Sequence, residues 1–155
     1  MCGIAGFCDF SRDNRTAEWG EVAWRMGETL ARRGPDDDGE WQTRQCALAH
    51  RRLAVIDPAH GAQPMVRTLE GGQCAICYNG ELYNTPELRR ELEALGVALE
   101  TWSDTEVLLN ACIAWGDGAA QRLEGIFAFA FWDGRRRRLM CCRDRFGVKP
   151  FFYAW

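Results

Sequence analysis

IFAFAFW, residues 126–132, is the stretch that decides the fold, and the turn pair Asp133-Gly134 and a second apolar segment, residues 139–143, follow it. This pattern predicts a β-hairpin whose first strand carries apolar side chains on both of its faces. Such a strand needs a layer of structure on each side, which excludes a single sheet with one face in water.

The rest of the chain supplies those layers. Three helical patterns precede the hairpin, from residue 16 to a stop at 34–35, from 86 to 96, and from 103 onward. Ser103 and Glu106 have the spacing of a capping box. Extended segments are predicted at residues 2–7, 47–57 and 74–78, and the pair Asn79-Gly80 after the last is typical of a tight turn. This order is no regular βα alternation, and it favours two sheets with helices outside them.

Composition indicates one globular domain. The chain has 155 residues, 47% hydrophobic and 26% charged, with 19 basic against 22 acidic side chains and a net charge of -3. That balance gives no electrostatic footprint for nucleic acid or an anionic membrane, and the run Arg135–Arg138 is interpreted as a solvated hairpin turn. The sequence has neither an apolar run near the roughly 18 residues that span a bilayer nor a signal peptide, so we expect a cytoplasmic protein without a membrane partner.

The eight cysteines are expected to be reduced thiols. Most lie in apolar segments, where cysteine behaves as a small buried hydrophobe. A zinc-binding interaction module, with Cys74, Cys77, Cys141 and Cys142 as ligands, is an alternative. Its weakness is that neighbouring residues of a strand, such as Cys141 and Cys142, point to opposite faces.

The N-terminus carries a candidate nucleophile. Removal of Met1 before the small residue Cys2 leaves one residue with both a thiol and a free α-amine. An α-amine titrates at roughly pH 7.7–8.0, so it is suited to accept the thiol proton without a histidine. His50 and His60 are therefore not required for catalysis, and His50 is interpreted as structural.

Further polar candidates follow along the chain. The side-chain N–H of Asn79 and the backbone N–H of Gly80 can together hold an oxyanion, if the pair is more than a turn. Arg52 suits a substrate carboxylate and Asp104 suits an ammonium. A surface ion pair and a helix N-terminal charge are equally consistent roles for these two, and spacing alone leaves both open.

Eight strings occur in order along the chain: MCGIAGF, RRGPDDDGEW, LAHRRLAVID, GAQPM, YNGELYN, SDTEVLL, LEGIFAFAFWD and RDRFGVKPFFY. Through them nearly the whole chain resembles the class II glutamine amidotransferase domain of the glutamine-hydrolysing asparagine synthetase family, an N-terminal-nucleophile hydrolase. Other class II amidotransferases share the Cys2 start and an Asn-Gly pair. The strings GAQPM and RDRFGVKP point to the asparagine synthetase branch.

The resemblance implies an α+β fold, the four-layer αββα sandwich of N-terminal-nucleophile hydrolases, over residues 1–155. By position, Cys2 is the nucleophile that forms a glutamyl thioester, and Asn79 and Gly80 form the oxyanion hole. The implied glutamine-binding residues are Arg52 for the carboxylate, Glu81 and Asp104 for the ammonium, and the backbone of Leu53, Ala54, Val55 and Ile56. No metal ligand is implied.

The chain also departs from the family pattern. Arg32 stands where the family often has histidine, and the family's domain continues past the position of Trp155, so we expect the last strands of the sandwich to be lacking. No synthetase domain or Gly-rich phosphate loop is present in the sequence. ATP and Mg are therefore expected only on a synthetase partner chain or domain, which would receive the ammonia. The alternative is a non-catalytic fragment or paralogue that needs a partner chain to fold or act.

Overall fold

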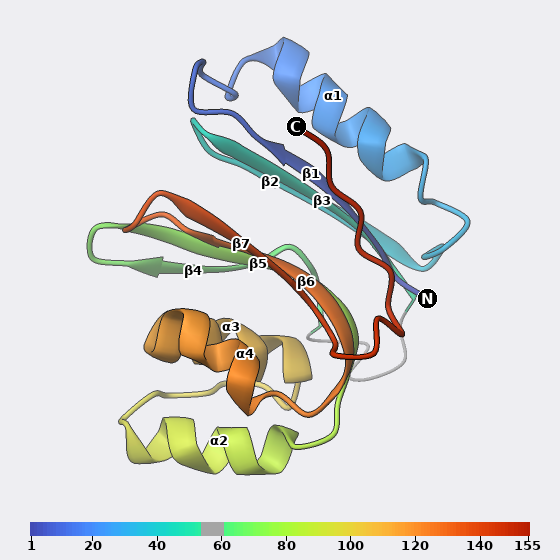
Figure 1. Ribbon diagram of the computed structural model, residues 1–155. Coiled ribbons are helices and arrows are strands. Elements are labelled where there is room, and N and C mark those ends of the chain that lie inside the picture. Colours follow the sequence, from blue (N-terminus) through green and yellow to red (C-terminus); the bar gives the residue numbers. More distant parts are fainter. Residues whose placement is uncertain (54–60) are drawn as a thin grey trace.

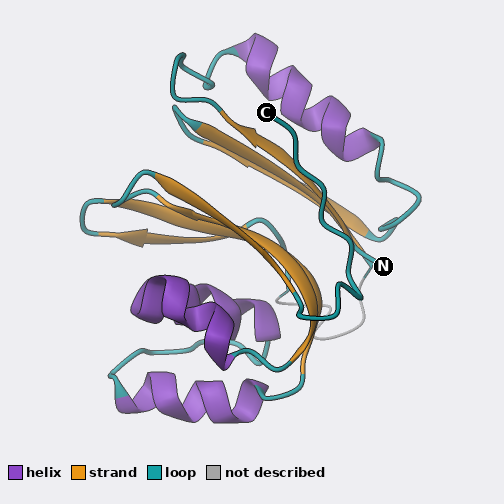
Figure 2. Ribbon diagram, in the orientation of Figure 1, coloured by secondary structure: helices purple, strands orange, loops and turns teal. Residues whose placement is uncertain are grey.

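Two antiparallel sheets lie face to face between layers of helices in the computed structural model, which describes residues 1–53 and 61–155 (Figures 1 and 2). The first sheet has the order β1-β3-β2 and the second β4-β5-β6-β7. The strands are β1 (Gly3–Cys8), β2 (Asp37–Gln42), β3 (Cys46–Arg52), β4 (Met65–Leu69), β5 (Gly72–Leu82), β6 (Gly125–Asp133) and β7 (Arg138–Arg143). The helices are α1 (Ala17–Glu28), α2 (Thr85–Ala94), α3 (Asp104–Trp115) and the short α4 (Ala119–Arg122), with a 3₁₀ turn at Gly116–Gly118.

Helices cover the outer face of each sheet. Helix α1 lies on the first sheet, α3 lies against the second, and α2 packs on α3 from outside (Figure 1). The layers therefore run helix, sheet, sheet, helix, which confirms the predicted α+β sandwich. In the part of the chain that the structure describes, no helix is long and apolar enough to cross a membrane.

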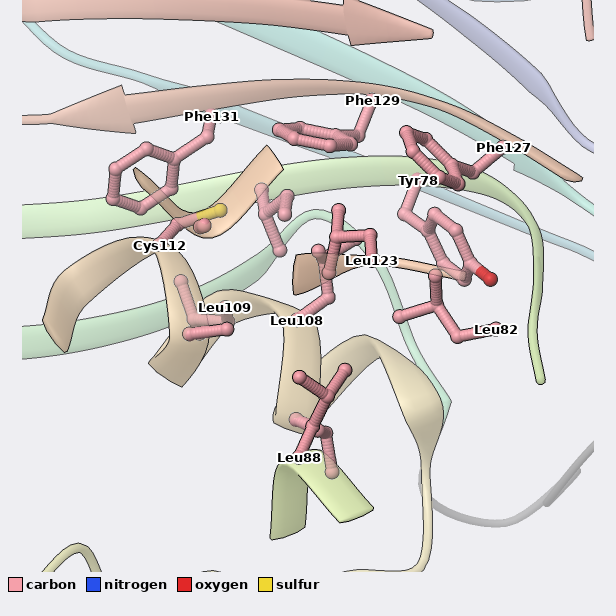
Figure 3. Packing of buried hydrophobic residues seen from close by; sticks show 14 of the residues in the cluster. Tyr78, Leu82, Leu88, Leu108, Leu109, Cys112, Leu123, Phe127, Phe129 and Phe131 are labelled. Carbon is pink, nitrogen blue, oxygen red and sulfur yellow. The ribbon is translucent and has the colours of Figure 1, made fainter. Parts of the chain in front are cut away.

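Strand β6 has both faces buried, as its sequence predicts. Phe127, Phe129 and Phe131 pack against the leucines of the helical layer, which Figure 3 shows from close by. Ala130 and Trp132 point the other way, into the core between the sheets. Burial of the three phenylalanine rings alone contributes roughly 5–9 kcal/mol to the hydrophobic stabilisation.

The predicted turn at Asn79-Gly80 is wrong, because β5 continues straight through both residues. Asn79 pairs with Ala128 and Gly80 with Phe127 across the ladder to β6. A Cβ atom at Gly80 would lie 2.2 Å from the carbonyl oxygen of Ile126. The glycine therefore serves close approach of two strands, and the long pairing with β6 overrides the local turn preference.

The predicted capping box is confirmed for Ser103 and wrong for Glu106. The Ser103 hydroxyl accepts a hydrogen bond from the N–H of Thr105, 3.2 Å away. The Glu106 carboxylate accepts from the N–H groups of Glu100 and Thr101, both at 2.8 Å, rather than from Ser103. Glu106 thus fixes the segment that enters α3 instead of closing the box.

The cysteines do not form the zinc site considered above. Cys74 and Cys142 belong to the helix-facing core, whereas Cys77 lies in the core between the sheets. Among the residues with described positions, no three His, Cys, Asp or Glu side chains are grouped to hold a metal ion. Four thiols, those of Cys46, Cys74, Cys77 and Cys112, are buried, as expected for small core residues.

Candidate active site

A pocket of about 200 Å³ lies where one end of the first sheet meets β5 and the start of α3. The walls therefore come from both sheets and from one helix N-terminus. The lining residues are Met1, Cys2, Arg52, Leu53, Gly61, Gln63, Tyr78, Asn79, Gly80, Glu81, Ser103, Asp104, Thr105, Ile126 and Lys149.

Cys2 lies at the mouth of β1, half-buried in the pocket wall. Its Sγ lies 3.4 Å from the amide nitrogen of Leu53 and 3.6 Å from the carbonyl oxygen of the same residue. The Arg33 guanidinium donates to the Cys2 carbonyl oxygen at 3.3 Å. These contacts hold the backbone and the thiol of Cys2 against the end of β3.

The backbone N–H of Gly80 points away from β6. The carbonyl oxygen of the neighbouring Phe127 accepts from the Asp144 N–H at 2.7 Å, and the Phe127 N–H donates to the Asp144 carboxylate at 3.3 Å. Both backbone groups of Phe127 therefore point to the β7 side, so Gly80 and Phe127 form a non-hydrogen-bonded pair. Strand β4 covers the other edge of β5 only as far as Ile76. The Gly80 amide is therefore directed to an edge of β5 that no strand of the described residues pairs with, at the pocket and beside the buried Asn79.

Arg52 and Asp104 bring opposite charges to the same pocket. Arg52 ends β3 and is 7% exposed, and Asp104 begins α3 and is 8% exposed. Burial raises the pKa of Asp104. The hydroxyl of Tyr78, which donates to Asp104 Oδ2 at 2.8 Å, opposes that rise in pKa. Glu81 is more exposed, at the rim.

A buried polar network lies behind the pocket. Gln63 accepts from the Tyr78 N–H at 2.6 Å and donates to the Thr105 hydroxyl at 3.3 Å. His50 Nε2 donates to the Tyr78 carbonyl oxygen at 3.2 Å. Burial lowers the pKa of His50 to about 4, so the ring is neutral at physiological pH and its contact is structural. The network fixes Tyr78 between the sheets and α3.

The structure brings together most of the residues singled out from the sequence. Those that line the pocket are Cys2, Arg52, Leu53, Asn79, Gly80, Glu81 and Asp104. Ala54, Val55 and Ile56 lie outside the described residues. The sequence reasoning missed Gln63 and Lys149 as pocket residues, although both lie in quoted strings, GAQPM and RDRFGVKPFFY. The chemical roles of all of them stay predictions.

A cysteine at the head of a strand, in a pocket of an αββα sandwich, defines the class of N-terminal-nucleophile hydrolases. Residues 1–155 match the family model of the glutamine amidotransferase domain, and the chain belongs to that family. It is thus an enzyme domain, and the predicted resemblance is confirmed.

Two of the relatives that the chain matches carry the name asparagine synthetase. The chain is 49% identical over 154 residues to asparagine synthetase [glutamine-hydrolyzing] 3 of Bacillus subtilis, covering 99% of this chain and 25% of the relative. It is 37% identical over 169 residues to a putative asparagine synthetase of Mycobacterium tuberculosis, with the same 99% and 25% coverage. The chain thus spans about a quarter of the length of these relatives.

Solved structures share the fold. Glutamine phosphoribosylpyrophosphate amidotransferase of B. subtilis superposes with a TM-score of 0.50 at 29% identity, over 59% of this chain and 22% of that one. A structure described as the allosteric regulatory enzyme of purine biosynthesis gives a TM-score of 0.51 at 28% identity, with the same coverage.

Proposed function

We propose that this domain hydrolyses glutamine to glutamate and ammonia through a thioester on Cys2. The observation that carries the proposal is the pocket in which the Cys2 thiol, the Asn79-Gly80 pair and the charges of Arg52 and Asp104 meet. Each lies on a different element or end of an element, so the fold, rather than local sequence, assembles the group.

The reaction begins after removal of Met1. The freed α-amine of Cys2 takes the thiol proton, and the thiolate attacks the side-chain amide carbon of glutamine. The Asn79 side chain and the Gly80 N–H stabilise the resulting oxyanion. The C–N bond then breaks, and ammonia leaves with a proton from the α-amine. Water attacks the γ-glutamyl thioester, the C–S bond breaks, and glutamate is released with the thiol restored.

Charge decides how the substrate binds. Arg52 pairs with the α-carboxylate of glutamine, and Asp104 and Glu81 neutralise its α-ammonium. The backbone of Leu53, which already contacts the Cys2 sulfur, lines the pocket beside the reacting amide. Recognition of both charged groups fixes the length of the substrate, since the amide must reach Cys2 from a point set by Arg52 and Asp104.

The ammonia is proposed to serve amide formation by a synthetase domain or partner chain. This follows the names of the relatives, which are asparagine synthetases about four times as long as this chain. ATP and Mg belong to that synthetase part. Every hydrolytic step above uses groups of this domain and water.

Glutamate release from glutamine by the purified chain tests the proposal, with the intact mass recorded on the same sample. Glutamate production by protein without Met1, and none by a Cys2→Ser variant prepared in parallel, supports it. No glutamate from a processed chain with a free Cys2 thiol would contradict it and favour a non-catalytic domain. Adding a synthetase chain in a second assay then distinguishes a partner requirement from lack of activity.

A further inference from the structure

Two thiols lie side by side on neighbouring strands of the first sheet, at the end remote from Cys2. Cys8 ends β1, Cys46 begins β3, and the two are direct cross-strand partners. The Cys46 carbonyl accepts from the Thr43 N–H at 2.7 Å, and the Asp9 N–H donates to the Gln45 carbonyl at 2.8 Å. The backbone groups of Cys46 therefore point away from β1, which makes Cys8 and Cys46 a non-hydrogen-bonded pair.

This kind of pair has the right geometry for a disulfide. Cα atoms in a non-hydrogen-bonded antiparallel pair lie about 4.5 Å apart, with the side chains close together. Disulfides span Cα separations of roughly 4.4–6.8 Å. Both residues are free thiols in this structure, so a bond between them requires oxidation but no change of register.

The environments of the two thiols differ in a way that suits stepwise oxidation. Cys8 is half-buried, and a hydrogen bond from Cys46 lowers its pKa. Donation of that hydrogen bond, together with burial, raises the pKa of Cys46, which is 0% exposed. Cys8 is thus the more accessible thiol, with a lowered pKa, and Cys46 is the protected thiol beside it.

We propose that Cys8 and Cys46 are a redox modification site that closes to a reversible disulfide with a peroxide as oxidant. The Cys8 thiolate attacks one peroxide oxygen, the O–O bond breaks, and the leaving hydroxide takes a proton to become water. Cys46 sulfur then attacks the sulfur of the Cys8 sulfenic acid. The S–O bond breaks, and a second water leaves with the thiol proton. Two thiols lose two electrons, which reduce one peroxide to two waters.

The bond would join the two strands that hold part of the pocket. Cys2 precedes β1 and Arg52 ends β3, whereas Cys8 and Cys46 lie at the opposite ends of the same strands. Closure also constrains the chain between residues 8 and 46, which includes α1 and β2. Oxidation is therefore expected to raise the unfolding temperature by several degrees, reversibly on reduction, because the cross-link restricts the unfolded chain.

Peptide mapping after treatment with one equivalent of hydrogen peroxide tests the site. Tryptic cleavage gives residues 45–51 with Cys46 and a peptide up to Arg12 that holds both Cys2 and Cys8. The mapping is therefore repeated on a Cys2→Ser chain. The expected product is a linked pair of these peptides, about 2 Da lighter than their sum and split by a thiol reductant. Cys8→Ala removes it.

Cys141→Ser is the matched control, since this exposed thiol on β7 is close enough to Cys8 for Cys8 to raise its pKa. The linked peptide persists in that variant if Cys46 is the partner. A Cys8–Cys141 link, or a stable Cys8 sulfenic acid with Cys46 still free, would overturn the proposal. Mapping the Cys2→Ser chain, which keeps Cys8, Cys46 and Cys141, distinguishes these products without a substitution at the buried Cys46.

Discussion

Tyr78→Phe removes one hydroxyl from behind the pocket and leaves the ring that fills the core. That hydroxyl donates to Asp104 Oδ2 at 2.8 Å, and the two residues are 3% and 8% exposed. A hydrogen bond to a charged group contributes about 1.5–3 kcal/mol. Tyr78 is therefore a positioning residue for Asp104, and its loss should be measurable in how the domain binds glutamine.

The magnitude follows from the titration of Asp104. Burial raises the pKa of this carboxyl group, and the Tyr78 hydrogen bond, with backbone donors such as the Thr105 N–H, holds that rise down. Because these backbone donors remain in the variant, the lower part of the energy range applies. Loss of the Tyr78 hydrogen bond therefore raises the pKa of Asp104 further, and a loss of about 1.5 kcal/mol weakens the pairing of Asp104 with the ammonium roughly tenfold. The KM for glutamine then increases about tenfold on the acid side of the profile, with kcat nearly unchanged.

Tyr78→Phe is also expected to lower the stability of the domain. A carboxyl whose pKa is higher in the folded state stabilises the fold below its unfolded pKa, and that contribution is lost as pH rises through the folded pKa. Tyr78→Phe raises the folded pKa of Asp104 further. The free energy of unfolding of the variant is thus lower than that of the parent at neutral pH, and the difference narrows in acid, where Asp104 is protonated in both.

Steady-state glutamate release across pH, with chemical denaturation of the same samples, measures both effects. Tyr83→Phe is the matched control, because that ring is 62% exposed and does not line the pocket. The reasoning is refuted if Tyr78→Phe keeps the parental KM and pH profile. A fall confined to kcat would equally refute it, since Tyr78 would then act on the reacting atoms.

Three further variants separate the proposed roles. Cys2→Ser should lose nearly all glutamate release yet still bind glutamine in calorimetry, and undiminished turnover would rule out the assigned nucleophile. Asn79→Ala should lower kcat by roughly 100- to 1000-fold as the loss of an oxyanion donor, whereas a change in KM alone would mean that Asn79 only shapes the pocket. Gly80→Ala should unfold several degrees below the parent, because its Cβ would lie 2.2 Å from the Ile126 oxygen. Gly118→Ala, with nothing within 4 Å, is the control, and equal melting temperatures would contradict the steric argument.

Sequence patterns predict the buried elements best. The doubly apolar run of β6 requires a layer of structure on each face, and the structure has a helical layer on one face and the first sheet on the other. Strands β2 (DDGEWQ) and β4 (MVRTL) were not predicted, because both are edge strands whose alternate residues are exposed. An edge strand buries little apolar surface, so the sequence constraint on it is weak.

In the pocket, too, some residues are predictable from the local sequence and others are not. Cys2 and the Asn79-Gly80 pair can be recognised in the sequence because the reactive groups of each belong to one residue or to two adjacent residues. Gln63 does not, since it acts by joining the backbone of β5 to a hydroxyl of α3, two segments far from it in sequence. Contacts of that kind follow from the packed structure and leave no local pattern.

Because the pocket is built from two sheets, the distance between the sheets affects the rate of the proposed reaction. Cys2 and Arg52 are attached to the first sheet, and Asn79 and Gly80 to the second. The layer between the sheets contains side chains as small as alanine, and its thickness sets the distance from the proposed nucleophile to the proposed oxyanion donors. A bulkier residue in this layer is expected to push the sheets apart and to slow turnover, although its side chain does not touch the substrate.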